Sequence, residues 1–128
     1  MQKAKMGNET PQDLRTRTLD FALRIVRLYV SLPKTTEAQV LGKQVLHSGT
    51  SVGANYREGH RAKSDPDIIN KFESVLQELD ETDYWLDLLV RSNILPAPKA
   101  EALIKETNEL IAIFTTIVTK IKKRMGKM

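Results

Sequence analysis

The 128-residue sequence contains no cysteine, which excludes disulfide bridges, thiolate zinc sites and cysteine nucleophiles. Aromatic residues make up only 5% of the chain, and the β-branched residues do not fall into alternating runs, so a β-sandwich or barrel is disfavoured. The longest apolar runs, such as residues 111–114, are far shorter than the roughly twenty residues of a membrane span. The first ten residues are polar and include Lys3 and Lys5, without the apolar stretch of a signal peptide. We therefore expect a cytoplasmic protein.

The sequence also lacks the short motifs that mark catalytic and metal sites. It has no Gly-rich phosphate loop and no HExxH or ExxH pair. Its two histidines, His47 and His60, are thirteen residues apart on one predicted helix, too far along the helix axis to share a metal ion. We expect no catalytic residue, no metal and no cofactor.

What the sequence does contain is enough apolar material for one helical domain, since 41% of its residues are hydrophobic. Thr10 followed by Pro11 predicts an N-cap and a first-turn proline, and Pro33 prevents this first helix from continuing. Thr36 and Gln39 have the spacing of a capping box that would open a second helix.

The second half of the chain shows the same kinds of helix start and stop signals. Ser64 and Pro66 again combine a cap with a first-turn proline, and Pro96 and Pro98 mark a tight connection before the last apolar pattern. Because short connections favour antiparallel neighbours, we expect an all-α, antiparallel, up-down-up-down four-helix bundle. The predicted organisation is a flexible N-terminus over residues 1–10 and a bundle over 11–125, with helices at about 11–32, 36–62, 66–93 and 98–125.

The second predicted helix has an unusually small inward stripe, formed by Leu41, Val45, Ser48, Val52, Asn55 and Gly59. Gly42, Gly49 and Gly53 lie on an adjacent stripe, and each glycine in a helix interior costs about 1 kcal/mol relative to alanine. Such a cost indicates close packing. Two explanations are open: a close helix crossing inside the monomer, or a subunit interface built on this face.

Polar residues interrupt the apolar pattern of both middle helices. Asn55 lies three residues after Val52, so we expect its amide to face the core, with Glu58 within helical reach. Buried amides and carboxylates need hydrogen-bond partners, which the third predicted helix could supply. We expect a structural polar network formed by Ser48, Ser51, Asn55, Glu58, Glu81, Tyr84 and Trp85.

The net charge of +4 conceals a strong segregation of charge along the chain. Residues 1–63 hold eleven lysines and arginines against five acids, residues 64–93 hold two against eight, and residues 94–128 hold seven against three. The third predicted helix is therefore acidic and the other three are basic. This segregation indicates complementarity between neighbouring helices or between subunits.

Two groups of cations are candidates for contact with phosphates, which require cations in a row and little specific geometry. One group follows a stripe of the second helix opposite its small residues, and the other forms a C-terminal tail without a nearby acid in the sequence. The alternative is a solvated face and a helix C-terminus favoured by its dipole. The candidate nucleic-acid-binding residues are Lys43, His47, Arg57, Arg61 and Lys63, then Lys120, Lys122, Lys123 and Arg124, followed by Lys127.

Three segments of the sequence resemble one known family: residues 47–59 (HSGTSVGANYREG), 71–73 (KFE) and 81–86 (ETDYWL). The resemblance is to the small four-helix-bundle proteins encoded in intervening sequences of bacterial 23S ribosomal RNA genes. It implies an up-down-up-down bundle assembled as a homopentamer. It also implies kinship with the accessory variability determinant proteins of diversity-generating retroelements, which engage nucleic acid and a reverse transcriptase.

These observations lead to three hypotheses about function. The first is a non-enzymatic homo-oligomeric scaffold that binds RNA or DNA through its basic surfaces, alone or beside a nucleic-acid enzyme such as a reverse transcriptase. The second is a protein–protein interaction module without nucleic-acid binding, whose cations serve only subunit contacts. The third is a metal-dependent nuclease acting through Asp80, Glu81, Asp83 and Asp87, although a helix would spread residues 80, 81 and 83 around its circumference.

Overall fold

The computed structural model describes residues 10–126 and contains four α-helices and no strand within that range. The helices are α1 (Pro11–Ser31), α2 (Thr36–His60), α3 (Asp65–Arg91) and α4 (Ala97–Arg124). These bounds differ from the predicted ones by at most two residues at either end of a helix. The predicted flexible N-terminus lies outside the described residues except for Thr10.

Side-chain caps open the first three helices. Thr10 accepts a hydrogen bond from the backbone N–H of Asp13, and the Asp13 carboxylate accepts one from the backbone N–H of Thr10. Ser64 caps α3 by accepting from the backbone N–H of Asp67. Both caps lie where the sequence predicts them. Each precedes a proline in the first turn, where the missing backbone N–H costs the helix no hydrogen bond.

The predicted capping box of the second helix is wrong by one residue. The N-cap of α2 is Thr35, whose hydroxyl accepts from the backbone N–H of Ala38. Gln39 does not reach back to the cap; its amide donates to the carbonyl of Pro33 and accepts from the hydroxyl of Tyr29. Gln39 therefore ties the loop and α1 to the first turn of α2.

The connection between the third and fourth helices begins with a residue in a conformation that ends a helix. Asn93 follows α3 with a φ of 64°, the left-handed conformation that commonly ends helices. Pro96 is the N-cap of α4 and makes no side-chain cap, and no acid lies in the first turn of α4. The positive end of the α4 dipole is therefore not compensated by this segment of the chain.

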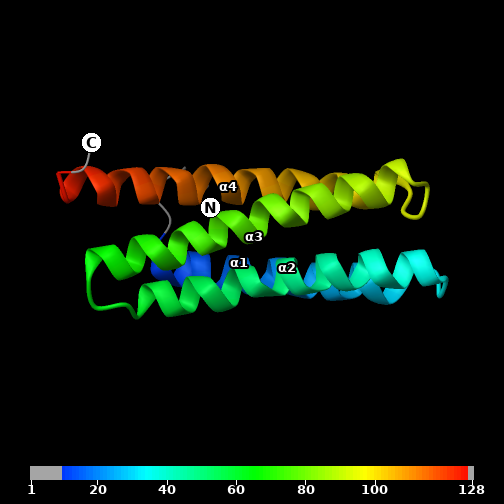
Figure 1. The fold of residues 1–128 in the computed structure, drawn as a ribbon, viewed down its shortest axis with the longest axis horizontal. Coiled ribbons are helices and arrows are strands. Elements are labelled where there is room, and N and C mark those ends of the chain that lie inside the picture. The colour runs from blue at the N-terminus through cyan, green and yellow to red at the C-terminus, as the bar shows by residue number, and fades with distance from the viewer. Residues whose placement is uncertain (1–9, 127–128) are drawn as a thin grey trace.

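The four helices form a bundle around one apolar core (Figure 1). The connections α1–α2 and α3–α4 lie at one end of the molecule, and the α2–α3 connection lies at the other end. Helix α2 packs along α1 and α3, and α3 packs along α4, whereas α1 and α4 are the least closely packed of the neighbouring helices. The largest fully buried apolar side chains are Phe21, Ile25, Leu79, Leu86, Leu89, Leu110, Ile113 and Phe114. None of the helices described combines the length and apolar character needed to cross a bilayer.

The small residues of α2 pack inside the monomer. A Cβ atom added at Gly42 would lie 2.7 Å from a methyl carbon of Leu32, and one at Gly49 would lie 2.6 Å from Cγ1 of Ile25. Gly59 lies in the same way against the ring of Phe72 on α3. Of the two explanations for these glycines, the close helix crossing is correct. The face is not available to a second subunit.

The expectation that Asn55 faces the core is wrong. Asn55 is half-buried, and the residue that completes the inward stripe after Val52 is Tyr56, four positions on and 3% exposed. The Tyr56 ring stacks on Phe72 at a centroid distance of 5.8 Å and meets the edge of Phe114 at 5.9 Å. Burying the large aromatic ring of Tyr56 is more favourable than burying the amide of Asn55, because a buried amide would need a hydrogen-bond partner.

Candidate nucleic-acid interface

The predicted cations of α2 lie on its solvent side. Lys43, His47 and Arg61 are exposed, Arg57 is half-buried, and Lys63 is exposed in the loop that follows. His47 and Arg57 are ten positions apart, or about 15 Å along the helix axis. The stripe is therefore two separate groups of cations rather than one continuous row.

An acid accompanies the first of these groups. Glu78 on α3 is close enough to His47 to feel its charge, which acts to lower the pKa of Glu78. Desolvation by burial and the neighbouring charge of Glu81 oppose this effect, and the pKa of Glu78 is raised above its ordinary value. The cations at this part of α2 therefore have a carboxyl group of α3 beside them, which the sequence stripe did not indicate.

The predicted C-terminal tail is only partly free of acids. The guanidinium of Arg124 makes a two-point contact with the carboxylate of Asp65, at 3.1 and 2.7 Å, and thereby lowers the pKa of Asp65. Lys122 lies 2.9 Å from a carboxylate oxygen of Glu73. Both acids come from α3, which is distant in sequence but packs along α4.

The expectation that these cations have no nearby acid is therefore wrong for Lys122 and Arg124. Lys123 is exposed and forms no ion pair with any described residue, and Lys120 is exposed. Lys127 lies outside the described residues.

The fold gathers part of the two predicted groups at one end of the bundle. The α2–α3 loop, with Arg61 and Lys63, and the C-terminal end of α4, with Lys123, lie at the same end (Figure 1). Lys43, near the beginning of α2, lies towards the opposite end. The best candidate for phosphate contacts is this cluster at the α2–α3 end: Arg57, Arg61, Lys63 and Lys123.

The predicted polar network does not form. Ser48 is buried and shares a hydrogen bond of 2.8 Å with the hydroxyl of Thr82, a residue that the prediction omitted. The hydroxyl of Ser51 donates a hydrogen bond to the backbone carbonyl of His47. Glu58 forms an exposed ion pair with Lys71 at 2.6 Å.

The remaining predicted members of the network lie close together on α3 without taking part in the Ser48 hydrogen bond. Glu81 is exposed, Tyr84 is 59% exposed, and Trp85 packs on the edge of the core. Tyr84 and Trp85 contact each other edge to face, at a centroid distance of 5.0 Å. Glu81, Tyr84 and Trp85 lie within one turn of one another on α3, but the residue of this turn that bonds Ser48 is the buried Thr82.

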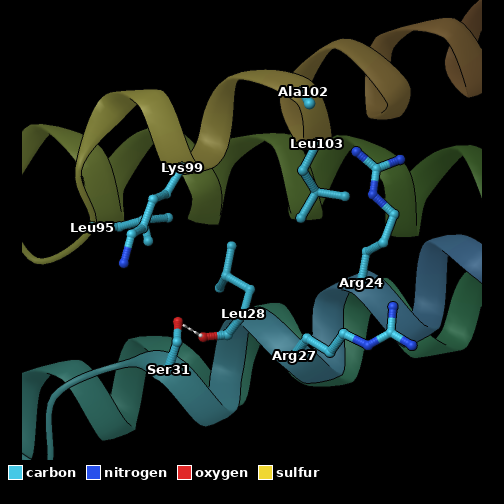
Figure 2. Close-up of a pocket in the computed structure, with 8 residues that line it drawn as sticks. All are labelled: Arg24, Arg27, Leu28, Ser31, Leu95, Lys99, Ala102 and Leu103. Atoms are coloured by element: carbon cyan, nitrogen blue, oxygen red, sulfur yellow. Dashed lines mark hydrogen bonds between the residues drawn. The ribbon is translucent and has the colours of Figure 1, made fainter.

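A basic groove between α1 and α4 was not predicted from the sequence. Its floor is apolar, made by Leu28, Leu95 and Leu103, and its volume is about 330 Å³. Figure 2 shows Arg24 and Arg27 reaching out from α1 and Lys99 from α4 around this floor. Within residues 10–126 none of these three cations forms an ion pair.

Only a partial signal for the groove exists in the sequence. Arg24 and Arg27 are three residues apart, so they are neighbours on the helix surface, and no acid follows within four residues of either. The wide spacing of α1 and α4 that opens the groove depends on packing and cannot be seen in the pattern.

Helix α1 also carries apolar side chains on its outer face. Leu19, Leu23, Val26 and Val30 follow spacings of four, three and four residues and are between 39% and 66% exposed. This spacing places them on one stripe, apart from the buried stripe through Phe21 and Ile25. The exposed stripe was not predicted from the sequence, because the buried stripe alone accounts for the helical period of α1.

No metal centre is evident in the described part of the chain. Across residues 10–126, no three side chains of histidine, aspartate or glutamate lie close enough to hold one ion. Two of the four acids considered for a nuclease already have polar partners: Asp83 accepts from the amide of Asn108, and Asp87 pairs with Arg91.

Comparison with known proteins gives a family assignment. Residues 12–116 match the family described as 23S rRNA-intervening sequence protein. The chain belongs to this family. The resemblance seen in the three sequence segments is thereby confirmed, and the match extends into α4, where those segments gave no specific signal.

A solved structure supports the same assignment. It is described as a protein with unknown function from the S23 ribosomal protein family of Bacteroides thetaiotaomicron VPI-5482. The two chains are 38% identical with a TM-score of 0.80, over 85% of this chain and 97% of that one. No curated protein matches this chain. The similarity to this family member supports the all-α, four-helix fold and leaves function to be argued from the residues.

Proposed function

We propose that this chain is an antiparallel, up-down-up-down bundle that assembles into a homopentameric ring and binds RNA or DNA electrostatically in the cytoplasm, without catalysis. The observation that carries the nucleic-acid part is a set of exposed cations that no acid of the described chain neutralises. These cations are Lys43, Arg61, Lys63 and Lys123. Phosphate binding through such residues is driven by counterion release and needs no shaped pocket.

Self-assembly is supported by the outer face of α1. Four large aliphatic side chains in one stripe, all more than a third exposed, are uncommon on the surface of a monomeric protein. Scattered exposed leucines and valines need no explanation, but a continuous stripe indicates that another surface covers it. Repetition of the basic cluster around a ring would multiply the attraction for a polyanion.

The proposal of a non-enzymatic role rests on how the acids of α3 are used. Three of them engage side chains of α4: Glu73 pairs with Lys122, Asp65 pairs with Arg124, and Asp83 accepts from Asn108. Acids engaged in this way hold the helices together and do not converge on a common point. A hydrolytic site needs such convergence.

The experiment is filter binding of single-stranded ribosomal RNA fragments to the purified chain. We expect an affinity that falls by orders of magnitude between about 50 and 200 mM salt. The variant carrying Arg61→Glu and Lys63→Glu should bind weakly and reduce the slope of log K against log salt by roughly one for each phosphate that is no longer neutralised. A variant with Lys34→Glu and Lys105→Glu, two exposed lysines outside the cluster, has the same net charge and serves as the control.

Two outcomes would refute the nucleic-acid part of the proposal. Negligible binding at low salt would leave the chain as a protein-interaction module, for which the apolar stripe of α1 provides a surface. Equal reductions of affinity in the cluster variant and its control would show that only net charge matters and that the α2–α3 end is not the site.

A further inference from the structure

If the chain forms a ring, the contact between subunits must use a surface other than the small residues of α2, because those residues are buried against α1 and α3. A ring with one kind of contact requires two different, complementary surfaces on each copy. The described part of the chain has two such surfaces, at the same level of the bundle.

The first surface is termed the basic face, and it lies on α1 and the adjoining groove. Its apolar centre is formed by Leu23, Val26 and Val30 on the outer side of α1. Arg27 is four residues from Leu23 and three from Val30, so its side chain borders this apolar centre. The groove cations Arg24, Arg27 and Lys99 complete the basic face.

No acid among residues 10–126 forms an ion pair with a cation of the basic face. Asp20, one turn before Arg24, is the acid of α1 nearest in sequence, and it forms no ion pair with either arginine. The contrast with Arg17 is informative, because Arg17 lies one further turn back on α1 and is held by Glu106 and Glu109 of α4. The charge of the basic face is therefore available to a partner.

The second surface is termed the acidic face and is formed by Asp80, Tyr84 and Asp87 on α3. Spacings of four and three residues place these side chains on one stripe, opposite the buried Thr82 and Leu86. Tyr84 is 59% exposed and its ring is steadied by the edge-to-face contact with Trp85. A projecting tyrosine among carboxylates is suited to a groove with an apolar floor and cationic walls.

The carboxylates of the acidic face can change partners at little cost. Asp80 is exposed and forms no ion pair with any residue from 10 to 126. Asp87 pairs with Arg91 one turn away, with the two side chains 59% and 78% exposed. Such exposed pairs within one helix contribute only about 0.3–0.5 kcal/mol.

The two faces lie at equal distances from the same end of the bundle. Helix α1 ends at Ser31 and α3 ends at Arg91, and the loops that follow these residues lie at one end (Figure 1). Arg27 and Asp87 are each four residues from that end, or about 6 Å along the axis. Arg24 and Tyr84 are each seven residues from it, or about 10 Å.

We propose that the acidic face of one copy of this chain docks onto the basic face of the next copy, side by side, around a closed ring. The inference rests on the self-assembly in the proposed function and names the two surfaces that perform it. Copies related by rotation about an axis along the bundles keep the levels of Arg27 and Asp87 matched. All copies then point the same way, so every α2–α3 end, with Arg61, Lys63 and Lys123, lies on one rim of the ring.

The test is reversal of charge on each face, followed by reversal on both. The variants are Arg24→Glu with Arg27→Glu on the basic face, and Asp80→Lys with Asp87→Lys on the acidic face. Their molar mass is measured by light scattering across a dilution series, with circular dichroism as the check on folding. The control is Lys34→Glu with Lys105→Glu, which changes net charge as much as the basic-face variant does.

Each single-face reversal should raise the concentration of half-dissociation by at least about a hundredfold, because like charges would then meet across the contact. The chain with both faces reversed should reassemble, and the control should match the wild type. A further variant, Tyr84→Ala, should also weaken assembly without changing any charge.

The outcomes separate this inference from the proposal on which it rests. A wild-type oligomer that survives both reversals would contradict the assigned faces and leave the scaffold proposal intact. Loss of assembly without rescue in the doubly reversed chain would show that the two faces do not meet each other. A wild-type chain that is monomeric at every concentration would overturn both the faces and the ring.

Discussion

The guanidinium of Arg17 on α1 makes a two-point contact with the carboxylate of Glu106 on α4, with nitrogen–oxygen distances of 2.7 and 2.9 Å. Glu109 accepts a further hydrogen bond of 2.7 Å from the same guanidinium. The hydrogen bond to Glu106 is the largest of the effects that raise the pKa of Arg17 well above its ordinary value. Because α1 and α4 are the least closely packed of the neighbouring helices, this contact is a polar tie across the widest side of the bundle.

Replacement of Arg17 by alanine should therefore destabilise the fold. The side chain of Glu106 is only 16% exposed, and without Arg17 its carboxylate would remain poorly solvated and unpaired. We expect the free energy of unfolding in urea to fall by about 1–3 kcal/mol, with a smaller decrease for Arg17→Lys, which cannot make the two-point contact. A decrease within about 0.5 kcal/mol, as expected for the exposed control Lys105→Ala, would show that the tie contributes little.

The glycines of α2 offer a matched pair of substitutions. A Cβ at Gly49 would lie 2.6–2.9 Å from three carbons of buried Ile25, whereas one at Gly53 would come no closer than 3.4 Å to Thr18. Gly49→Ala should lower the free energy of unfolding by about 1–3 kcal/mol through overpacking. Gly53→Ala should be neutral or raise it by up to about 1 kcal/mol, since alanine favours helix. Thermal unfolding of both variants measures this contrast, and equal effects would contradict the close α1–α2 crossing.

The hydroxyl pair of Ser48 and Thr82 should behave as a coupled unit. The two oxygens are 2.8 Å apart and both residues are buried, and Thr82 also bonds the carbonyl of Glu78. Ser48→Ala alone should cost about 1 kcal/mol. The double variant with Thr82→Val should cost less than the sum of the single changes, because neither hydroxyl is then left without its partner. Strict additivity in urea titrations would indicate that the two hydroxyls do not interact.

The carboxylate of Glu78 predicts a dependence of stability on pH. Burial, with the nearby charge of Glu81, raises the pKa of Glu78 above its ordinary value of 4.5, and one of its oxygens is buried without a hydrogen-bond partner. A raised pKa in the folded state means that the folded chain binds more protons than the unfolded chain between 4.5 and the raised pKa. Stability contributed by this group is therefore present at low pH and lost as the pH rises through that window.

Glu78→Gln should accordingly raise the melting temperature at pH 7, and this advantage should shrink as the pH falls through that window and be lost below 4.5. The measurement is a series of thermal melts of wild type and variant from neutral to acid pH. Gln77→Glu, one residue earlier and exposed, is the matched control in which no such trend is expected. An advantage independent of pH would assign the effect to packing rather than to the charge.

The positions of the helices could be predicted because their signals are local. Thr10 and Ser64 each precede a proline in the first turn, and the hydrogen bonds at these caps involve residues three positions apart. Thr35 and Thr36 are adjacent and chemically equivalent, so the pattern could not decide which of them caps α2. The geometry of Gln39, which bonds Tyr29 and Pro33 instead of the cap, depends on how α1 packs.

The candidate sites were predicted less well because charge neutralisation is not local. Asp65 and Glu73 lie far from Arg124 and Lys122 in the sequence, yet α3 places them within ion-pairing distance. The predicted inward stripe of α2 is wrong at one position, because Tyr56 rather than Asn55 follows Val52 on the buried side of the helix. The groove between α1 and α4 depends on the spacing of two helices at opposite ends of the chain.

The proposal that this chain works as an assembled ring is decided by the molar mass of the wild-type protein in solution. Light scattering at micromolar concentration and moderate salt should give five times the chain mass of 14.5 kDa. The mass should fall at high dilution, when the contacts dissociate. A mass of one chain at every concentration would contradict the ring, because the apolar stripe of α1 would then have no partner in a second copy.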